Sequence, residues 1–220
     1  MIRLKDVLKT YRTRSGVVKA LDGINLRIEK GEFIVVCGPS GSGKTTLLMT
    51  LAGMQHPTGG TVTVEQNNIY AMSARTRAKF RARNIGFVFQ MFHLIPYLNI
   101  IENIVLAGGT AANKNKKAQA NELIEKFGLM GRALHKPPEL SAGEKQRTAI
   151  ARALLNKPGI VLADEPTGNL DSDNTASVLG YLSQFHHAGG TVILATHATV
   201  ANNLADRIIY LRNGRIDNSE

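Results

Sequence analysis

The sequence has very little cysteine and no long hydrophobic run, and each absence excludes a class of protein. Its 220 residues include one cysteine, Cys37, so no disulfide can form within the chain. The longest apolar runs, such as Phe33–Cys37 and Thr191–Ala195, are far shorter than the roughly 20 residues that a membrane-spanning helix needs. The opening residues Met1–Asp6 are too polar for a signal peptide. We therefore expect an intracellular protein that is soluble by itself, with any membrane span supplied by another chain.

Acidic residues are also scarce relative to basic ones. The chain carries 27 Lys and Arg against 17 Asp and Glu, which gives a formal net charge of +10. Such a surplus suggests an anionic partner: a nucleotide, a nucleic acid or the cytoplasmic face of a membrane. With 43% hydrophobic and 20% charged residues the composition is that of a globular protein, and the length predicts one domain.

Short apolar strands alternate with helices along most of the chain, after an N-terminal stretch that is typical of short strands separated by turns. The expected strands are Phe33–Cys37, Thr61–Glu65, Ile85–Gln90, Ile160–Asp164, Thr191–Thr196 and Ile208–Leu211. The expected helices are one that follows the loop after Cys37 and includes Leu51, then Asn99–Ala107, Lys116–Gly128, Ser141–Asn156 and Ser172–Phe185. This alternation predicts an α/β fold with a largely parallel sheet.

The segment Gly38–Thr45, GPSGSGKT, matches the pattern G-x-x-x-x-G-K-[ST] between an expected strand and an expected helix. Its glycines let backbone N–H groups converge on phosphate oxygens, and the helix N-terminus adds a favourable dipole. In such a loop Lys44 would hold the β- and γ-phosphates and Thr45 would ligate Mg²⁺. We therefore predict a nucleotide site made by Gly38, Pro39, Ser40, Gly41, Ser42, Gly43, Lys44, Thr45 and Thr46.

An apolar strand, Ile160–Asp164, ends in two adjacent acids, Asp164 and Glu165. In P-loop proteins the aspartate at such a strand end fixes Mg²⁺. The next side chain projects in another direction and can face the water that attacks the γ-phosphate. The pair predicts Asp164 as a metal residue and Glu165 as the general base; two solvated acids are the alternative.

The segment Leu140–Glu144 has two interpretations. Ser141 and Glu144 have the S-x-x-E spacing of a capping box, which explains both residues without any function. A serine and a glycine at a helix N-terminus can also bind an anion. Taken alone, these residues favour the capping box.

Together these motifs resemble the nucleotide-binding subunit of an ABC transporter over nearly the whole chain. The most specific segment is Leu140–Arg147, which is similar to the family's signature pattern LSGGQ, with Ala142 for the first Gly and Glu144 for Gln. The resemblance implies a P-loop NTPase with a RecA-like parallel-sheet core and an N-terminal antiparallel β subdomain. A helical subdomain of roughly 92–156 would be inserted into this single domain of residues 1–220. The methyl group of Ala142 would lie near the approach to the γ-phosphate.

The resemblance also implies roles for three further residues. Gln90 is similar to the family's glutamine that contacts Mg²⁺ and water, and His197 to the histidine that bonds the γ-phosphate. Tyr11 matches the aromatic residue that stacks on adenine. A polar strand end, a structural histidine and plain packing are the respective alternatives.

The partners that the resemblance implies are ATP with Mg²⁺, a second copy of the chain and a separate transmembrane permease. In a two-fold ATP sandwich, Ser141 and Gly143 would reach the γ-phosphate bound by the other copy. Gly168–Asp171 resembles the loop that crosses to that copy, or is an ordinary loop before a helix. The motifs resemble the lipoprotein-release, macrolide-export and cell-division branch, which implies export or mechanical transmission from the cytoplasmic face of the inner membrane.

Two rival functions remain open at this point. A soluble ABC ATPase could act on nucleic acid or in cofactor assembly, but the chain has one cassette and no long insertion, so we do not expect nucleic acid as a partner. A P-loop kinase would need a phosphate-acceptor site and no signature helix. ATPase activity without an acceptor would exclude the kinase.

Two segments have no assigned role. Arg75–Arg83 contains five cations and no acid, and is either a solvated face or a contact for lipid headgroups or for acidic loops of a partner. Met91–Leu98 is unusually apolar. It resembles the stretch where the permease's coupling helix docks, or it belongs to the helical core.

Overall fold

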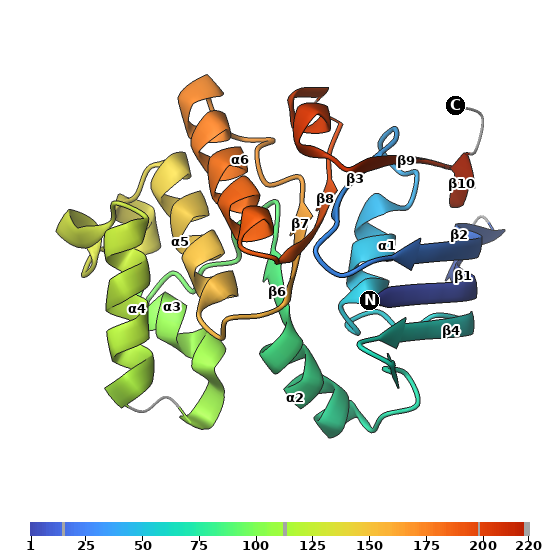
Figure 1. Ribbon diagram of the computed structural model, residues 1–220, viewed down its shortest axis with the longest axis horizontal. Coiled ribbons are helices and arrows are strands. Elements are labelled where there is room, and N and C mark those ends of the chain that lie inside the picture. Colours follow the sequence, from blue (N-terminus) through green and yellow to red (C-terminus); the bar gives the residue numbers. More distant parts are fainter. Residues whose placement is uncertain (15, 112–113, 198, 218–220) are drawn as a thin grey trace.

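Two sheets form the framework of the computed structural model, which describes residues 1–14, 16–111, 114–197 and 199–217 (Figure 1). The antiparallel sheet has the order β2-β1-β4-β5 and consists of β1 (Ile2–Thr13), β2 (Gly16–Ile28), β4 (Gly59–Val64) and β5 (Asn67–Asn68). The second sheet has the order β10-β9-β3-β8-β7-β6. Its strands are β3 (Phe33–Cys37), β6 (Ile85–Val88), β7 (Ile160–Asp164), β8 (Thr191–Ala195), β9 (Arg207–Arg212) and β10 (Arg215–Asp217). From β9 to β6 all neighbours pair in parallel, and β10 pairs antiparallel with β9.

Helices connect and cover these strands. They are α1 (Lys44–Leu51), α2 (Ala74–Asn84), α3 (Ile100–Val105), α4 (Lys114–Lys126), α5 (Ala142–Leu154) and α6 (Ser172–His187). Short 3-10 helices cover Leu106–Ala111, Met130–Arg132, Pro137–Glu139 and Thr199–Leu204. Within the described residues, none of the helices has the length and hydropathy to cross a membrane.

The parallel sheet separates two hydrophobic cores. Alternate residues of one strand enter different cores: Ile34 and Val36 face the first, and Phe33 and Val35 face the second. The first core joins this sheet to α1 and to the antiparallel sheet, and the second joins it to α3, α4, α5 and α6. Because both faces are covered, the strands read as continuous apolar runs. This confirms the predicted α/β class with a parallel core and an N-terminal antiparallel sheet.

The N-terminal stretch differs from the expected short strands. It forms two long strands, β1 and β2, of 12 and 13 residues. Asp22-Gly23, a pair that is typical of a turn, lies inside β2, where the pairing with β1 shifts register and Gly23 has φ of 73°. A glycine in this conformation makes a bulge as readily as a turn, so the sequence pattern did not distinguish them.

Other boundaries differ by a few residues. β6 ends at Val88, so Phe89 and Gln90 lie beyond the strand that was expected to include them. The basic run, to which the sequence assigned no element, forms α2, whose N-cap Ser73 accepts a hydrogen bond from the Thr76 N–H. α3, α4 and α5 lie within or close to 92–156, and the division of the chain into subdomains stays a prediction.

Candidate functional site

A cleft of about 620 Å³ lies where β3, β6, β7 and β8 end at the same edge of the parallel sheet. Its lining residues are Ala20, Ser40, Gly41, Ser42, Gly43, Lys44, Thr45, Thr46, Gln90, Glu165 and His197. Ligands of open α/β sheets bind outside the carboxyl ends of the strands, so this is the expected place for a site. The structure thus brings the phosphate-loop motif together with Gln90, Glu165 and His197.

The loop Gly38–Gly43 takes its path from glycines at two crowded positions. Gly43, with φ of 109°, caps α1, and a Cβ there would lie 2.3 Å from the Ala20 carbonyl oxygen. Gly38 has φ of 150°, and its Cβ would lie 2.2 Å from the Leu211 carbonyl oxygen. Any side chain would therefore push the loop away from β2 and β9. Ala20, which the sequence analysis missed, reaches the site through its backbone, so its residue type carried no signal.

Lys44 lies over the loop and is only 8% exposed. Its Nζ donates hydrogen bonds to the carbonyl oxygens of Gly38, at 2.7 Å, and Pro39, at 3.2 Å. The same Nζ lies 3.8 Å from Glu165 Oε1. An anion that enters the cleft could replace the two neutral carbonyl acceptors with stronger, charge-assisted hydrogen bonds from this ammonium.

Asp164 ends β7 and is 5% exposed. Burial raises the pKa of its carboxyl group, against the opposing hydrogen bond from the Thr45 side chain. Its Oδ1 is buried and has no hydrogen-bond partner among the described residues. A carboxylate oxygen left unpaired beside a threonine hydroxyl fits the oxygen ligands that Mg²⁺ prefers. No cluster of three His, Cys, Asp or Glu side chains in the described ranges offers another metal site.

Glu165 joins the two sides of the cleft. It has φ of 45°, and its N–H bonds the Ala195 carbonyl oxygen at 2.8 Å, which turns the chain sharply after β7. Its Oε2 lies 3.0 Å from His197 Nδ1, opposite the contact of Oε1 with Lys44. The Glu165 side chain is 12% exposed and that of His197 71% exposed. The carboxylate is therefore fixed between a buried cation and an imidazole that remains open to solvent.

Six predicted site residues are not among those that line the cleft. Gly38, Pro39 and Asp164 adjoin it in the phosphate loop and at the end of β7, whereas Tyr11, Ser141 and Gly143 lie on other elements. Tyr11, on β1, is 37% exposed, and Lys9 Nζ lies 5.0 Å from its ring centroid. Ser141 caps α5, and Gly143 is buried in its first turn. The structure leaves the predicted roles of Tyr11, Ser141 and Gly143 open.

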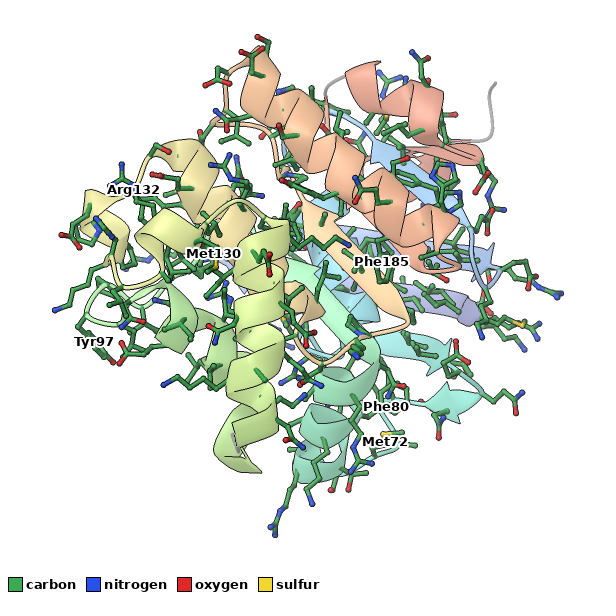
Figure 2. The ribbon with its side chains drawn as sticks, turned by 60° about the vertical axis from the view of Figure 1, so that its left-hand side comes forward. Met72, Phe80, Tyr97, Met130, Arg132 and Phe185 are labelled. Carbon is green, nitrogen blue, oxygen red and sulfur yellow. The ribbon has the colours of Figure 1, made fainter. Side chains whose placement is uncertain are left out.

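The N-terminus of α5 forms the capping box that the sequence suggested. The Ser141 hydroxyl accepts a bond from the Glu144 N–H at 3.2 Å, and the Glu144 carboxylate accepts one from the Ser141 N–H at 2.8 Å. That backbone bond, reinforced by Arg132, lowers the pKa of Glu144. Arg132, labelled in Figure 2, reaches Glu144 from the 3-10 helix Met130–Arg132. The structure therefore confirms the capping box. Binding of Ser141 to a nucleotide held by a second copy stays a prediction.

Comparison with known proteins gives close matches over the whole chain. The family described as ABC transporter matches residues 21–168. The lipoprotein-releasing system ATP-binding protein LolD of Hyphomonas neptunium is 42% identical, over 98% of this chain and 96% of that protein. The macrolide export ATP-binding/permease protein MacB of Brucella melitensis is also 42% identical, but the match covers 98% of this chain and only 34% of MacB.

A solved structure has the same fold over the full length. It is the dimeric post-hydrolysis state of the ATP-binding cassette MJ0796 bound to ADP and Pi, which superposes with a TM-score of 0.93 at 38% identity. The superposition covers 100% of this chain and 98% of that one.

Proposed function

We propose that this chain, which belongs to the ABC transporter family of ATP-binding cassettes, works as one of two copies that close around ATP and drive a separate permease. Its ATPase character follows from the family. The observation that carries the finer proposal is the Glu165 carboxylate, 3.0 Å from His197 Nδ1 and 3.8 Å from Lys44 Nζ inside the cleft. Because the family hydrolyses ATP, water is the proposed acceptor of the γ-phosphoryl group.

Each cleft residue has a task that its position supports. Lys44 exchanges its bonds to the loop carbonyls for bonds to the β- and γ-phosphates, where its charge offsets theirs. Glu165 accepts a proton from the attacking water, and His197 orients that water or the γ-phosphate. Ser42, whose buried Oγ has no partner among the described residues, supplies a further donor to a phosphate oxygen. Tyr11 is the proposed stacking surface for adenine.

Mg²⁺ is the proposed metal, held by Thr45, Asp164 and Gln90. The unpaired Oδ1 of Asp164, the adjacent Thr45 hydroxyl and the amide oxygen of Gln90 would supply the oxygen ligands. When bound, the ion supplies positive charge beside the transferred phosphoryl group.

The second copy would supply Ser141 and Gly143. Ser141 is exposed at the start of α5 and lies outside the cleft lining of its own chain. Its capping bond uses one acceptor lone pair and leaves the hydroxyl proton free to donate. The dimeric structure of MJ0796 supports a two-copy arrangement for this chain too.

Glu165→Gln tests this proposal. The amide keeps the size of the side chain but removes the base, so ATP binding should persist while hydrolysis falls at least about a hundredfold. The variant should accumulate as a dimer with two ATP in size-exclusion chromatography with Mg-ATP, whereas the unmodified chain forms it transiently. Hydrolysis at the normal rate would assign the base elsewhere. A variant that binds ATP but stays monomeric would contradict the two-copy site.

The permease is proposed to dock beside the segment Met91–Leu98. A groove of about 260 Å³, lined from α2, β6 and α5, lies next to this segment. Arg152 fixes the segment by donating bonds at 2.6 Å to the Phe92 and His93 carbonyl oxygens. Met91 and Tyr97 are 67% and 72% exposed, which is unusual for such side chains. Figure 2 shows Tyr97 at the outer edge of the helical side. The similarity to LolD and MacB supports a permease of the lipoprotein-release or export type.

The charge on α2 supports a place at an anionic membrane surface. Arg75, Lys79 and Arg83 are exposed and recur every four residues, so they share one face of the helix. Arg77 and Arg81 point inward, to the Tyr70 ring and to the carbonyl oxygens of Met72 and Gly53. Phe80, labelled in Figure 2, packs against the first core, so α2 exposes no aromatic ring for stacking on nucleic-acid bases. The three outward cations form what we call the α2 stripe.

Vesicle flotation tests this placement. The protein should bind phosphatidylcholine vesicles that contain phosphatidylglycerol better than pure phosphatidylcholine vesicles. A cation near such a surface contributes about 1 kcal/mol, so R75Q/K79Q/R83Q should lower the partition coefficient about a hundredfold. K30Q/K126Q/R212Q is the matched control, because it removes three exposed cations that are scattered over other elements. Equal losses in both variants would show that net charge, rather than the α2 stripe, causes binding.

A further inference from the structure

The N-terminal halves of α5 and α6 are joined by one side chain, Asn174. The two helices lie next to each other in Figure 1, and both begin at the same end. Arg147 Nη1, on α5, donates a hydrogen bond to Asn174 Oδ1 at 2.9 Å. Asn174 Nδ2 donates in turn to the two carboxylate oxygens of Asp171, at 3.0 and 2.8 Å. Every polar atom of this amide is thus used to connect α5 with the residue that precedes α6.

Asn174 also occupies the space beside Gly143. A Cβ on Gly143 would lie 2.0 Å from Asn174 Oδ1 and 2.5 Å from its Cγ. Gly143 is buried at this contact, although its neighbours Ser141 and Ala142 are exposed. A glycine at position 143 therefore leaves the space that Asn174 occupies. This is a reason for the glycine besides its proposed approach to a nucleotide.

The backbone of Asn174 also bonds Asp171. The Asn174 N–H donates to Asp171 Oδ1 at 2.8 Å, which makes Asp171 the N-cap of α6. This backbone bond and the side-chain bonds from Asn174 lower the pKa of Asp171. The end of the loop Gly168–Asp171 is consequently bound to the same amide that contacts Gly143.

We propose that Asn174 is a positioning residue, which makes the signature segment Ser141–Gly143 and the loop Gly168–Asp171 one rigid unit. The proposal rests on the proposed function, in which both segments approach the second copy. Because the unit is fixed before the two copies meet, neither segment has to be ordered at the moment of closure. Asn174 itself lies outside the cleft lining and does not take part in the chemistry.

A distance measurement in the monomer tests the rigid unit without any nucleotide. Spin labels on A142C and N169C, in a chain whose single native cysteine is replaced by C37S, report the separation of the two segments. The distance distribution should be narrow, and N174A should broaden it. S177A is the matched control, because Ser177 is exposed on α6 and its hydroxyl bonds the Asp173 carbonyl oxygen within the same helix. An N174A distribution as narrow as that of S177A would overturn the proposal.

Dimerisation then tests the consequence. In chains that carry E165Q, N174A should weaken ATP-driven dimerisation about tenfold or more, since it removes hydrogen bonds to two charged groups. The ATP affinity of the monomer should stay unchanged. A general loss of stability would lower both ATP affinity and dimerisation. G143A should also weaken dimerisation, because its methyl group would displace Asn174 and would alter a residue that is proposed to approach the other copy's nucleotide. Normal dimerisation of N174A would overturn the positioning role. Failure of the E165Q parent to dimerise would contradict the proposed function. The distance distributions would still show whether Asn174 holds the two segments rigidly together.

Discussion

The cleft and the N-terminus of α5 differ in how their polar groups are satisfied. In the cleft, Asp164 is buried with an unpaired Oδ1, and Lys44 bonds carbonyl groups of its own loop. At the start of α5, Ser141 and Glu144 complete each other's bonds in a closed capping box. The cleft thus holds groups that a ligand would complete, whereas the α5 end is complete as a helix terminus. This comparison predicts that the cleft groups that favour ligand binding lower the stability of the unliganded protein. At the α5 end, a substitution can change binding to the second copy without changing stability.

The largest expected effect comes from Lys44→Ala, which removes the cation of the cleft. ATP affinity should fall at least about a hundredfold, because a hydrogen bond to a charged group contributes about 1.5–3 kcal/mol and the ammonium can make more than one. Calorimetric titration with a non-hydrolysable ATP analogue measures this. Lys30→Ala, at an exposed position on the loop before β3, is the control. Unchanged affinity in Lys44→Ala would show that the cleft is not the nucleotide site.

The next effect separates the two regions. Ser141→Asp keeps a good N-cap for α5 but places a carboxylate where the other copy's γ-phosphate is expected. Thermal stability and monomer ATP affinity should be retained while ATP-driven dimerisation is lost. Ser141→Ala serves as the converse, since it should cost about 1 kcal/mol of stability through the lost cap. It should weaken dimerisation without abolishing it, because it removes the hydroxyl donor but adds no negative charge. Light scattering that shows normal dimers for Ser141→Asp would leave Ser141 as a cap only.

The smallest effect concerns stability at Asp164. Its carboxyl pKa is raised by burial above the ordinary 3.8, so the folded protein holds this proton more tightly than the unfolded chain does. The folded state therefore loses stability as pH rises from 3.8 through the raised pKa, and the loss is complete above it. Asp164→Asn removes the charge, so it should be more stable than the unmodified chain at pH 7 and gain nothing below the ordinary pKa. Urea unfolding at pH 7 and at the lowest pH where both fold gives the difference. A less stable variant at pH 7 would contradict the opposition between stability and ligand binding in the cleft.

Most of the cleft could be predicted because its residues follow apolar strands. The bounds of β3 and β7 follow from continuous hydrophobic runs, which place Gly38–Thr45 and Asp164 at the same sheet edge. Glu165 and His197 follow neighbouring strands, so their proximity is a consequence of the parallel order. Their direct contact, at 3.0 Å, depends on the left-handed backbone conformation of Glu165. A glutamate in the sequence does not predict that conformation.

What the sequence did not predict depends on contacts between distant backbones and on ambiguous local signals. Ala20 lines the cleft because β2 crosses the phosphate loop. Its contact is made by a backbone carbonyl group, which every residue type has, so the sequence could not predict it. Asp22-Gly23 is typical of a turn, yet pairing with β1 makes it a bulge. The link from Arg147 through Asn174 to Asp171 was invisible because asparagine near a helix start has an ordinary capping explanation.

The contact of the phosphate loop with β2 and with the turn between β9 and β10 has a consequence for the order of folding. The Gly214 N–H bonds the Ser42 carbonyl oxygen, and the Asp22 N–H bonds the Gly214 carbonyl oxygen, at 2.9 and 2.8 Å. Contacts across such long stretches of chain form late, because the loop-closure entropy is lost before they stabilise anything. A ribosome-bound chain whose turn at Gly214 has not yet emerged would hold Ser42 without this support. The nucleotide could thus act as a folding ligand only after the turn at Gly214 has emerged, so ATP would select chains that have made this contact rather than help shorter nascent ones.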